Sequence, residues 1–138
     1  MIAYLDSSVL LRVVLGQKNR LEQWQTIETG VASALVEVEC LRTLDRLRLA
    51  EGIPENDLVS RREAIYRLLE SLEVIEPTRL VLHRAAQPLP TTLGTLDAIH
   101  LATAVLWQET RGHDLVMATH DRSLALAARA CGLRAIGV

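Results

Sequence analysis

Two short apolar segments of this sequence each end abruptly at a polar turn that carries an aspartate. Ile2–Leu5 is followed by Asp6. Leu115–Ala118 is followed by the triplet 119–121, which ends in Asp121. Short apolar runs without alternation are typical of strands buried on both faces, as in parallel sheets. If the two strands are parallel neighbours, both aspartates lie at the carboxyl edge of the sheet, where open α/β sheets bind ligands.

Helical patterns and short strand candidates alternate along the rest of the chain. Helices are predicted at about 7–15, 20–29, 34–50, 54–71, 79–87, 96–109 and 122–131, with short strands at 31–32, 74–75 and 135–136. This alternation predicts a mostly parallel central sheet covered by helices on both faces, which is a three-layer α/β/α fold. No repeat or linker interrupts the pattern, so residues 1–138 are expected to form a single domain.

Hydroxyl and glycine residues predict where several of these helices begin and end. Ser7 or Ser8, Ser33 and Thr95 are expected to act as N-caps, because their side chains accept hydrogen bonds from free backbone N–H groups. Gly30 is expected to end the second helix, since glycine favours helix C-termini.

Composition sets limits on the class of protein. The chain has 138 residues, is 49% hydrophobic and carries a formal net charge of −2, so it has enough apolar material for a core and no strong overall basic charge. Its two cysteines, Cys40 and Cys131, lie far apart and favour reduced thiols. No signal peptide or membrane span is recognisable. These features predict a cytoplasmic protein without a membrane partner.

Four carboxylates occupy positions that local structure does not require. Asp6 and Asp121 follow the two apolar strands, and Asp97 lies in the first turn of a strongly apolar helix. Glu39 lies three residues after Val36, beside the apolar stripe of its helix, so it is expected to point toward the sheet.

Each carboxylate also has a simpler explanation. Asp121 fits an N-cap, and Asp97 fits a helix-dipole interaction in a first turn. Glu39 could pair with Arg42 on the helix surface, and Glu37 competes with it for a place in the site. A carboxylate that ends a central strand costs stability unless it is paired or solvated, so the simple explanation is weakest for Asp6.

Carboxylates gathered in one pocket repel each other, and a proton or a cation must relieve that repulsion. The only lysine is Lys18, so no lysine lies close in sequence to serve as the partner. Hard oxygen ligands favour Mg²⁺ or Mn²⁺, and such ions support phosphodiester hydrolysis. An acidic, metal-binding α/β protein therefore points to a nuclease.

Four motifs resemble those of PIN-domain proteins, specifically VapC-type toxins of toxin–antitoxin pairs. They appear in the family's order and span essentially the whole chain. They are Tyr-Leu-Asp-Ser-Ser with Asp6, the segment from Ser33 to Arg42 with Glu39, Leu-Asp-Ala-Ile-His-Leu-Ala-Thr-Ala with Asp97, and Ala-Thr-His-Asp with Asp121.

The resemblance implies a metal-dependent endoribonuclease that uses Mg²⁺ or Mn²⁺ to hydrolyse RNA. Its acidic quartet would be Asp6, Glu39, Asp97 and Asp121, with the first three holding the metal directly or through water and Asp121 more peripheral. The resemblance also implies a homodimer and a cognate antitoxin that inserts a peptide near the site. The alternative is a catalytically silent PIN fold that binds RNA or a partner.

Two other α/β or metal-binding classes fit less well. A phosphoacceptor receiver module needs adjacent acidic residues after its first strand and a late lysine, whereas Asp6 is flanked by Leu5 and Ser7. An HD-type phosphohydrolase is suggested by His120-Asp121, but that fold is all-helical and this dipeptide follows a strand-like run.

Several further residues have two open interpretations. His100, three residues after Asp97, is either a partner of the site or, by the preferred interpretation, a satisfied core histidine. Arg42 and Arg46 are either phosphate contacts or part of a solvated face. Ser7 or Thr119 is either a hydroxyl that orients a carboxylate or water, or simply a helix cap or turn former. Trp24 and Trp107 either stack on bases or, by the preferred interpretation, pack in the core or against a partner. Leu10, Val14, Leu21 and Trp24 are expected to contribute to an antitoxin groove or a dimer face.

Overall fold

A single parallel sheet of five strands forms the centre of the computed structural model, which describes residues 1–138. The strand order is β3-β2-β1-β4-β5, and every neighbouring pair is parallel. The strands are β1 (Ile2–Leu5), β2 (Thr29–Ser33), β3 (Glu73–Ile75), β4 (Val116–Ala118) and β5 (Arg134–Ile136). The two strands predicted to end at aspartates, β1 and β4, are therefore direct neighbours in the middle of the sheet.

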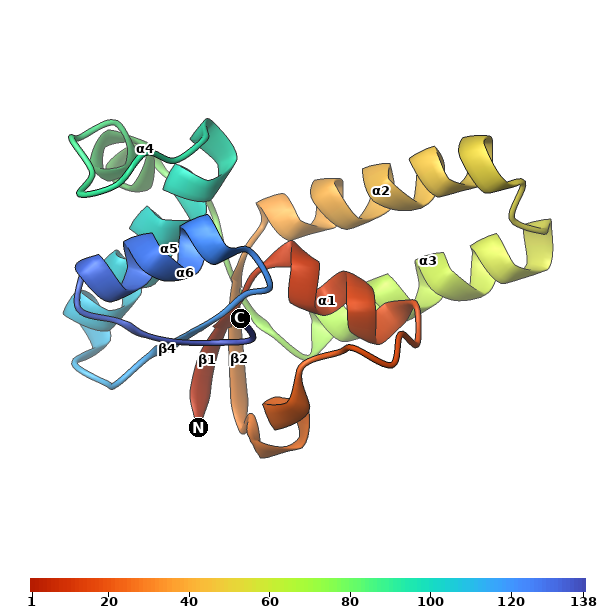
Figure 1. The fold of residues 1–138 in the computed structure, drawn as a ribbon, viewed down its shortest axis with the longest axis horizontal. Coiled ribbons are helices and arrows are strands. Elements are labelled where there is room, and N and C mark those ends of the chain that lie inside the picture. The colour runs from red at the N-terminus through yellow and green to blue at the C-terminus, as the bar shows by residue number, and fades with distance from the viewer.

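Helices cover both faces of this sheet and confirm the predicted three-layer α/β/α fold (Figure 1). The helices are α1 (Ser7–Val14), α2 (Leu35–Glu51), α3 (Glu55–Glu70), α4 (Arg79–Ala85), α5 (Thr95–Arg111) and α6 (Arg122–Ala130), with a 3-10 helix η1 at Glu22–Thr26. In Figure 1, α1, α2 and α3 lie on one side of the strands, and α4, α5 and α6 lie on the other. None of these helices combines the length and apolarity that crossing a membrane would require.

Two separate hydrophobic cores fill the spaces between the sheet and the helical layers. Successive residues of a strand point to opposite faces. In β1, Ala3 and Leu5 accordingly pack with α1, α2 and α3, whereas Tyr4 packs with α5 and α6. This alternation buries the Tyr4 side chain completely and aims it at the layer that carries Asp97 and His100.

Four of the local predictions about helix ends are wrong. Asp6 caps α1 in place of Ser7 or Ser8, and α5 begins at Thr95 with Gly94 at the cap position. Gly30 lies inside β2, not at a helix end. A Cβ there would overlap the side chains of Leu5 and Leu72, so close packing of the sheet explains this glycine. The N-cap of α2 is Ala34 and not the predicted Ser33, whose hydroxyl instead accepts from the N–H of Leu35, the first residue of the helix.

The proposed docking role of the N-terminal apolar residues is contradicted by their burial. Leu10, Val14 and Leu21 are 2%, 7% and 2% exposed and belong to the core beneath α1, α2 and α3. Trp24 is partly buried against the same core. These side chains are used to fix α1 and η1 to the rest of the chain, and they do not form a free surface for a partner.

Candidate active site

Asp6 is fixed at the carboxyl end of β1 by three hydrogen-bond donors. Its Oδ1 accepts from the backbone N–H of Ser7 at 2.8 Å, and its Oδ2 accepts from the hydroxyls of Ser8 at 2.7 Å and Thr119 at 2.9 Å. The residue is only 4% exposed. These donors compensate for removing the carboxylate from water and define the direction in which its free lone pairs point.

Thr119 and Ser8 also tie the turn after β4 to the turn after β1. The N–H of Asp121 donates to the Thr119 hydroxyl at 3.0 Å, and the N–H of His120 donates to the Ser8 hydroxyl at 3.0 Å. Of the two hydroxyls considered from sequence, Thr119 is the one that orients a carboxylate, while Ser7 contributes its backbone N–H. Ser8 was missed in this role, although a hydroxyl two residues after a strand-ending aspartate is a recognisable local signal.

Asp121 combines its two predicted roles. It is the N-cap of α6, and its Oδ1 accepts from the N–H of Leu124 at 2.9 Å. Its charge also acts on Asp97. The capping explanation is therefore correct, and the same carboxylate belongs to the acidic cluster.

Glu39 reaches the site from the second turn of α2, as predicted, and Glu37 does not. The Glu39 side chain is 19% exposed, and its Oε1 lies 2.6 Å from Nε2 of His100. Glu37 is exposed and lines a surface pocket beside Tyr66 of α3. The two residues differ because a two-residue step turns a helix by about 200°, which places them on different sides.

His100 is fully buried with both ring nitrogens hydrogen-bonded, so the preferred interpretation as a satisfied core histidine is confirmed, and the same residue also contacts the acidic cluster. Its Nδ1 lies 2.7 Å from the Tyr4 hydroxyl, and its Nε2 lies 3.9 Å from Oδ1 of Asp6. Burial lowers the pKa of His100, but the hydrogen bond and charge of Glu39 outweigh it, so the pKa lies above the usual value. The sequence signal available was the i, i+3 spacing from Asp97.

Asp97 shows that the four carboxylates share one electrostatic environment. Burial raises the pKa of Asp97 above its usual value, and the charges of Asp6 and Asp121 raise it further. The charge of Glu39 adds to this effect, whereas that of His100 opposes it. The other three predicted carboxylates therefore all act on Asp97, at the carboxyl edge of the sheet.

The tryptophans and the α2 arginines are engaged in packing and surface contacts. Trp107 is 7% exposed and packs in the core beneath α5 and α6, as predicted. Arg42 forms an exposed ion pair with Asp45 at 3.3 Å, and Arg46 donates to the Thr43 hydroxyl at 3.0 Å. Both arginines lie on a solvated face of α2, and neither contacts the carboxylates.

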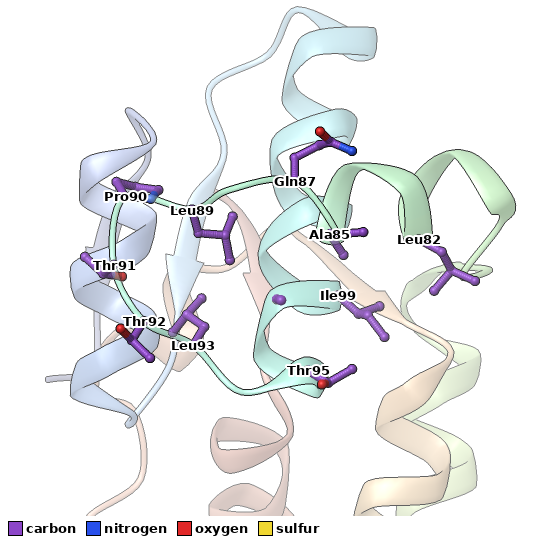
Figure 2. Close-up of a pocket in the computed structure, with 12 residues that line it drawn as sticks. Leu82, Ala85, Gln87, Leu89, Pro90, Thr91, Thr92, Leu93, Thr95 and Ile99 are labelled. Atoms are coloured by element: carbon purple, nitrogen blue, oxygen red, sulfur yellow. The ribbon is translucent and has the colours of Figure 1, made fainter.

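The largest cavity, of about 710 Å³, is separate from the acidic cluster. Figure 2 shows it between Leu82 of α4, Ile99 of α5 and the connecting loop at 87–93. Helical residues advance by about 100° each, so Thr95 and Ile99 share one side of α5 and Asp97 lies on the other. The cavity therefore does not open toward the carboxylates.

The donor chemistry of the cluster fits a hard divalent cation. Carboxylate oxygens are the preferred ligands of Mg²⁺ and Mn²⁺, and the pKa of Asp97 is raised by its burial and by the neighbouring carboxylates, whose charge a cation would offset. No three acidic, histidine or cysteine side chains are already arranged as a complete ligand set. Mg²⁺ does not require a complete ligand set from the protein, because it keeps several waters and is held by one or two carboxylates together with substrate phosphates.

Comparison with known proteins identifies the family. The family model described as PIN domain matches residues 3–130. The chain belongs to the PIN domain family. It is 34% identical to Ribonuclease VapC46 of Mycobacterium tuberculosis (strain ATCC 25618 / H37Rv) over 137 residues, which cover 96% of this chain and 95% of that protein. The resemblance to VapC proteins drawn from the four motifs is confirmed.

Solved structures show the same fold at low sequence identity. The VapBC2 structure from Rickettsia felis, bound to a DNA fragment from their promoter, matches this PIN domain with a TM-score of 0.68 and 12% identity, over 98% of this chain and 97% of that one. A toxin–antitoxin complex from Klebsiella pneumoniae matches with a TM-score of 0.65 and 16% identity, over 91% of each chain. The predicted PIN-like fold is therefore confirmed independently of the motifs.

Proposed function

We propose that this PIN domain is a metal-dependent endoribonuclease that acts as the toxin of a toxin–antitoxin pair. The observation that carries the proposal is the convergence of Asp6, Glu39, Asp97 and Asp121 at one edge of the sheet, where the other three carboxylates all raise the pKa of Asp97 in addition to the effect of its burial. The VapC46 relative is named a ribonuclease, and its similarity extends over nearly the whole chain. PIN-domain ribonucleases are generally dependent on divalent metals.

In this proposal, Asp6, Glu39 and Asp97 hold Mg²⁺ or Mn²⁺ directly or through water, and Asp121 completes the pocket. A bound divalent cation lowers the pKa of a coordinated water and neutralises charge on the phosphate that is attacked. Asp6 has its orientation set by Ser8 and Thr119. Burial and, in addition, the charges of Asp6, Asp121 and Glu39 raise the pKa of Asp97, and a bound cation would favour its ionised form.

The proposal extends to partners, location and domain organisation. The Klebsiella pneumoniae match is a toxin–antitoxin complex, and this supports a cognate antitoxin as a protein partner. We also propose a homodimer, a cytoplasmic site of action where RNA is accessible, and a single PIN domain over residues 1–138. These statements stay predictions.

The decisive experiment is cleavage of total cellular RNA by the purified protein with Mg²⁺, with Mn²⁺ and with a chelator. Asp97→Asn is compared with a matched variant, Asp114→Asn. Asp114 is exposed and precedes β4, so it lies at the opposite edge of the sheet from the carboxylate cluster. We expect discrete fragments that require metal, are lost in Asp97→Asn and persist in Asp114→Asn.

Other outcomes have separate meanings. Cutting by both the wild type and Asp97→Asn indicates a contaminating nuclease. Absence of cutting under every metal condition favours the catalytically silent alternative, once mass spectrometry has shown that no antitoxin co-purified. Retained RNA binding without cleavage in that case would replace the nuclease with a binding module.

A further inference from the structure

A buried series of hydrogen bonds connects the sheet to Glu39, one of the four carboxylates. The Tyr4 hydroxyl lies 2.7 Å from Nδ1 of His100, and Nε2 of His100 lies 2.6 Å from Oε1 of Glu39. Tyr4 and His100 are both completely buried, and their rings meet edge to face with centroids 5.9 Å apart. These hydrogen bonds connect β1, α5 and α2, which are far apart in the sequence.

Both ring nitrogens of His100 are occupied, so the imidazole cannot turn freely. An ionised Glu39 only accepts hydrogen bonds, and Nε2 of His100 therefore carries the proton of that contact. On the far side, the Tyr4 hydroxyl accepts from the backbone N–H of Ser33 at 3.2 Å, which fixes the tyrosine at the end of β2. The imidazole of His100 is thus held between Glu39 and a tyrosine that is itself fixed by the backbone of β2.

Glu39 has no other means of being held in position. Asp6 receives three donors from the turns around it, and Asp121 is fixed as a helix cap. Glu39 lies inside α2, where backbone N–H groups are already used by the helix. Its longer side chain also has more rotatable bonds than an aspartate, so orientation must come from a group outside its own helix.

We propose that His100, supported by Tyr4, is a positioning residue that fixes Oε1 of Glu39 and leaves Oε2 available to a divalent cation. This inference rests on the proposed function. Groups that hold a metal-binding carboxylate by hydrogen bonds change metal affinity when they are removed, typically by about 10- to 100-fold. His100 therefore contributes to cation binding without touching the cation.

The test measures Mn²⁺ binding to the purified full chain by electron paramagnetic resonance, without RNA. His100→Met removes the donor at similar length, whereas His100→Gln retains an N–H at about the position of Nε2. Leu101→Ala is the matched stability control, because Leu101 is buried on the same helix, in the core that also contains Tyr4, and its apolar side chain makes no hydrogen bond to the carboxylates. Thermal unfolding of each variant is recorded in parallel.

We expect His100→Met to weaken Mn²⁺ binding by about 10-fold or more and His100→Gln by less than about 3-fold. Leu101→Ala should lower the melting temperature and leave Mn²⁺ affinity unchanged. Glu39→Gln combined with His100→Met should bind Mn²⁺ no more weakly than Glu39→Gln alone, because His100 acts through Glu39. If His100→Met does not fold, Tyr4→Phe replaces it, with an expected loss of Mn²⁺ affinity.

Three results would overturn the inference: wild-type affinity in His100→Met, equal losses in the Met and Gln variants, or additive losses in the double variant. Failure of the proposed function would give a different experimental result. In that case the wild-type protein itself binds no Mn²⁺ and cuts no RNA. A wild type that binds Mn²⁺ alongside an unaffected His100→Met variant rejects only the role of His100.

Discussion

The Thr119 hydroxyl donates a hydrogen bond to Oδ2 of Asp6 at 2.9 Å, across 113 residues of sequence. The same hydroxyl oxygen accepts from the N–H of Asp121 at 3.0 Å. One side chain therefore links the carboxylate that ends β1 to the aspartate that begins α6. This link makes the geometry of the acidic cluster depend on the pairing of β1 with β4.

Thr119→Val should destabilise the protein and reduce cleavage together. The substitution keeps the shape of the side chain but leaves Asp6 with one donor fewer and the Asp121 N–H without its acceptor. A buried polar group left unpaired costs about 1–3 kcal/mol, and urea denaturation would measure this loss. Thr26→Val serves as control, because its hydroxyl donates to a carbonyl on the exposed η1 helix and its loss should cost less than about 0.5 kcal/mol. Equal stability of the two variants would contradict a special role for Thr119.

Asp97→Asn should make the metal-free protein more stable at neutral pH. The pKa of Asp97 is raised above 3.8 in the folded state, so its ionised form opposes folding. This cost is fully present above the raised pKa and disappears as the pH falls below 3.8, where Asp97 is protonated in both the folded and the unfolded state. The stability advantage of Asp97→Asn over the wild type should therefore shrink with acidification in urea titrations. An advantage that stays constant with pH would show that the ionised carboxylate of Asp97 is not its source.

Substitutions of Asp121 should separate its two roles. Asparagine caps helices about as well as aspartate, so Asp121→Asn should keep the free energy of unfolding within about 0.5 kcal/mol and still reduce RNA cleavage. Asp121→Ala should reduce cleavage and also cost about 1 kcal/mol, because the N–H of Leu124 loses its acceptor. Unchanged cleavage in Asp121→Asn would reduce this residue to a helix cap.

Gly137→Ala should disturb the site from a distance. Gly137 has φ +100°, and a Cβ there would overlap the carbonyl oxygen of Thr119. Gly112 also has positive φ, at +67°, but has open space around it, so Gly112→Ala should cost only about 1 kcal/mol. A loss more than twice as large is expected for Gly137→Ala, with reduced cleavage that follows the displaced Thr119. Thermal unfolding and RNA cleavage of both variants would check this difference.

Local sequence patterns predicted many of the strands, helices and site residues of this protein. Apolar runs ending at Asp6 and Asp121 located the two central strands, and helical spacing placed Glu39 and not Glu37 toward the sheet. These inferences worked because side-chain direction in strands and helices follows from the backbone repeat alone. Local signals were weaker at the two ends of helices, where Asp6 replaced the predicted serine cap and Gly30, predicted to end a helix, proved to be a packing residue within β2.

The amino-acid sequence by itself determined the α/β pattern, the positions of the four carboxylates and the family of the chain, because each is encoded in short segments. Only the tertiary structure decided the strand order, which places β1 between β2 and β4. It also decided the contact of His100 with Glu39 across 61 residues, and the burial of Leu10, Val14 and Leu21 beneath α1, α2 and α3. Such pairings depend on how distant elements pack, and neither hydrophobic periodicity nor helix capping contains that information.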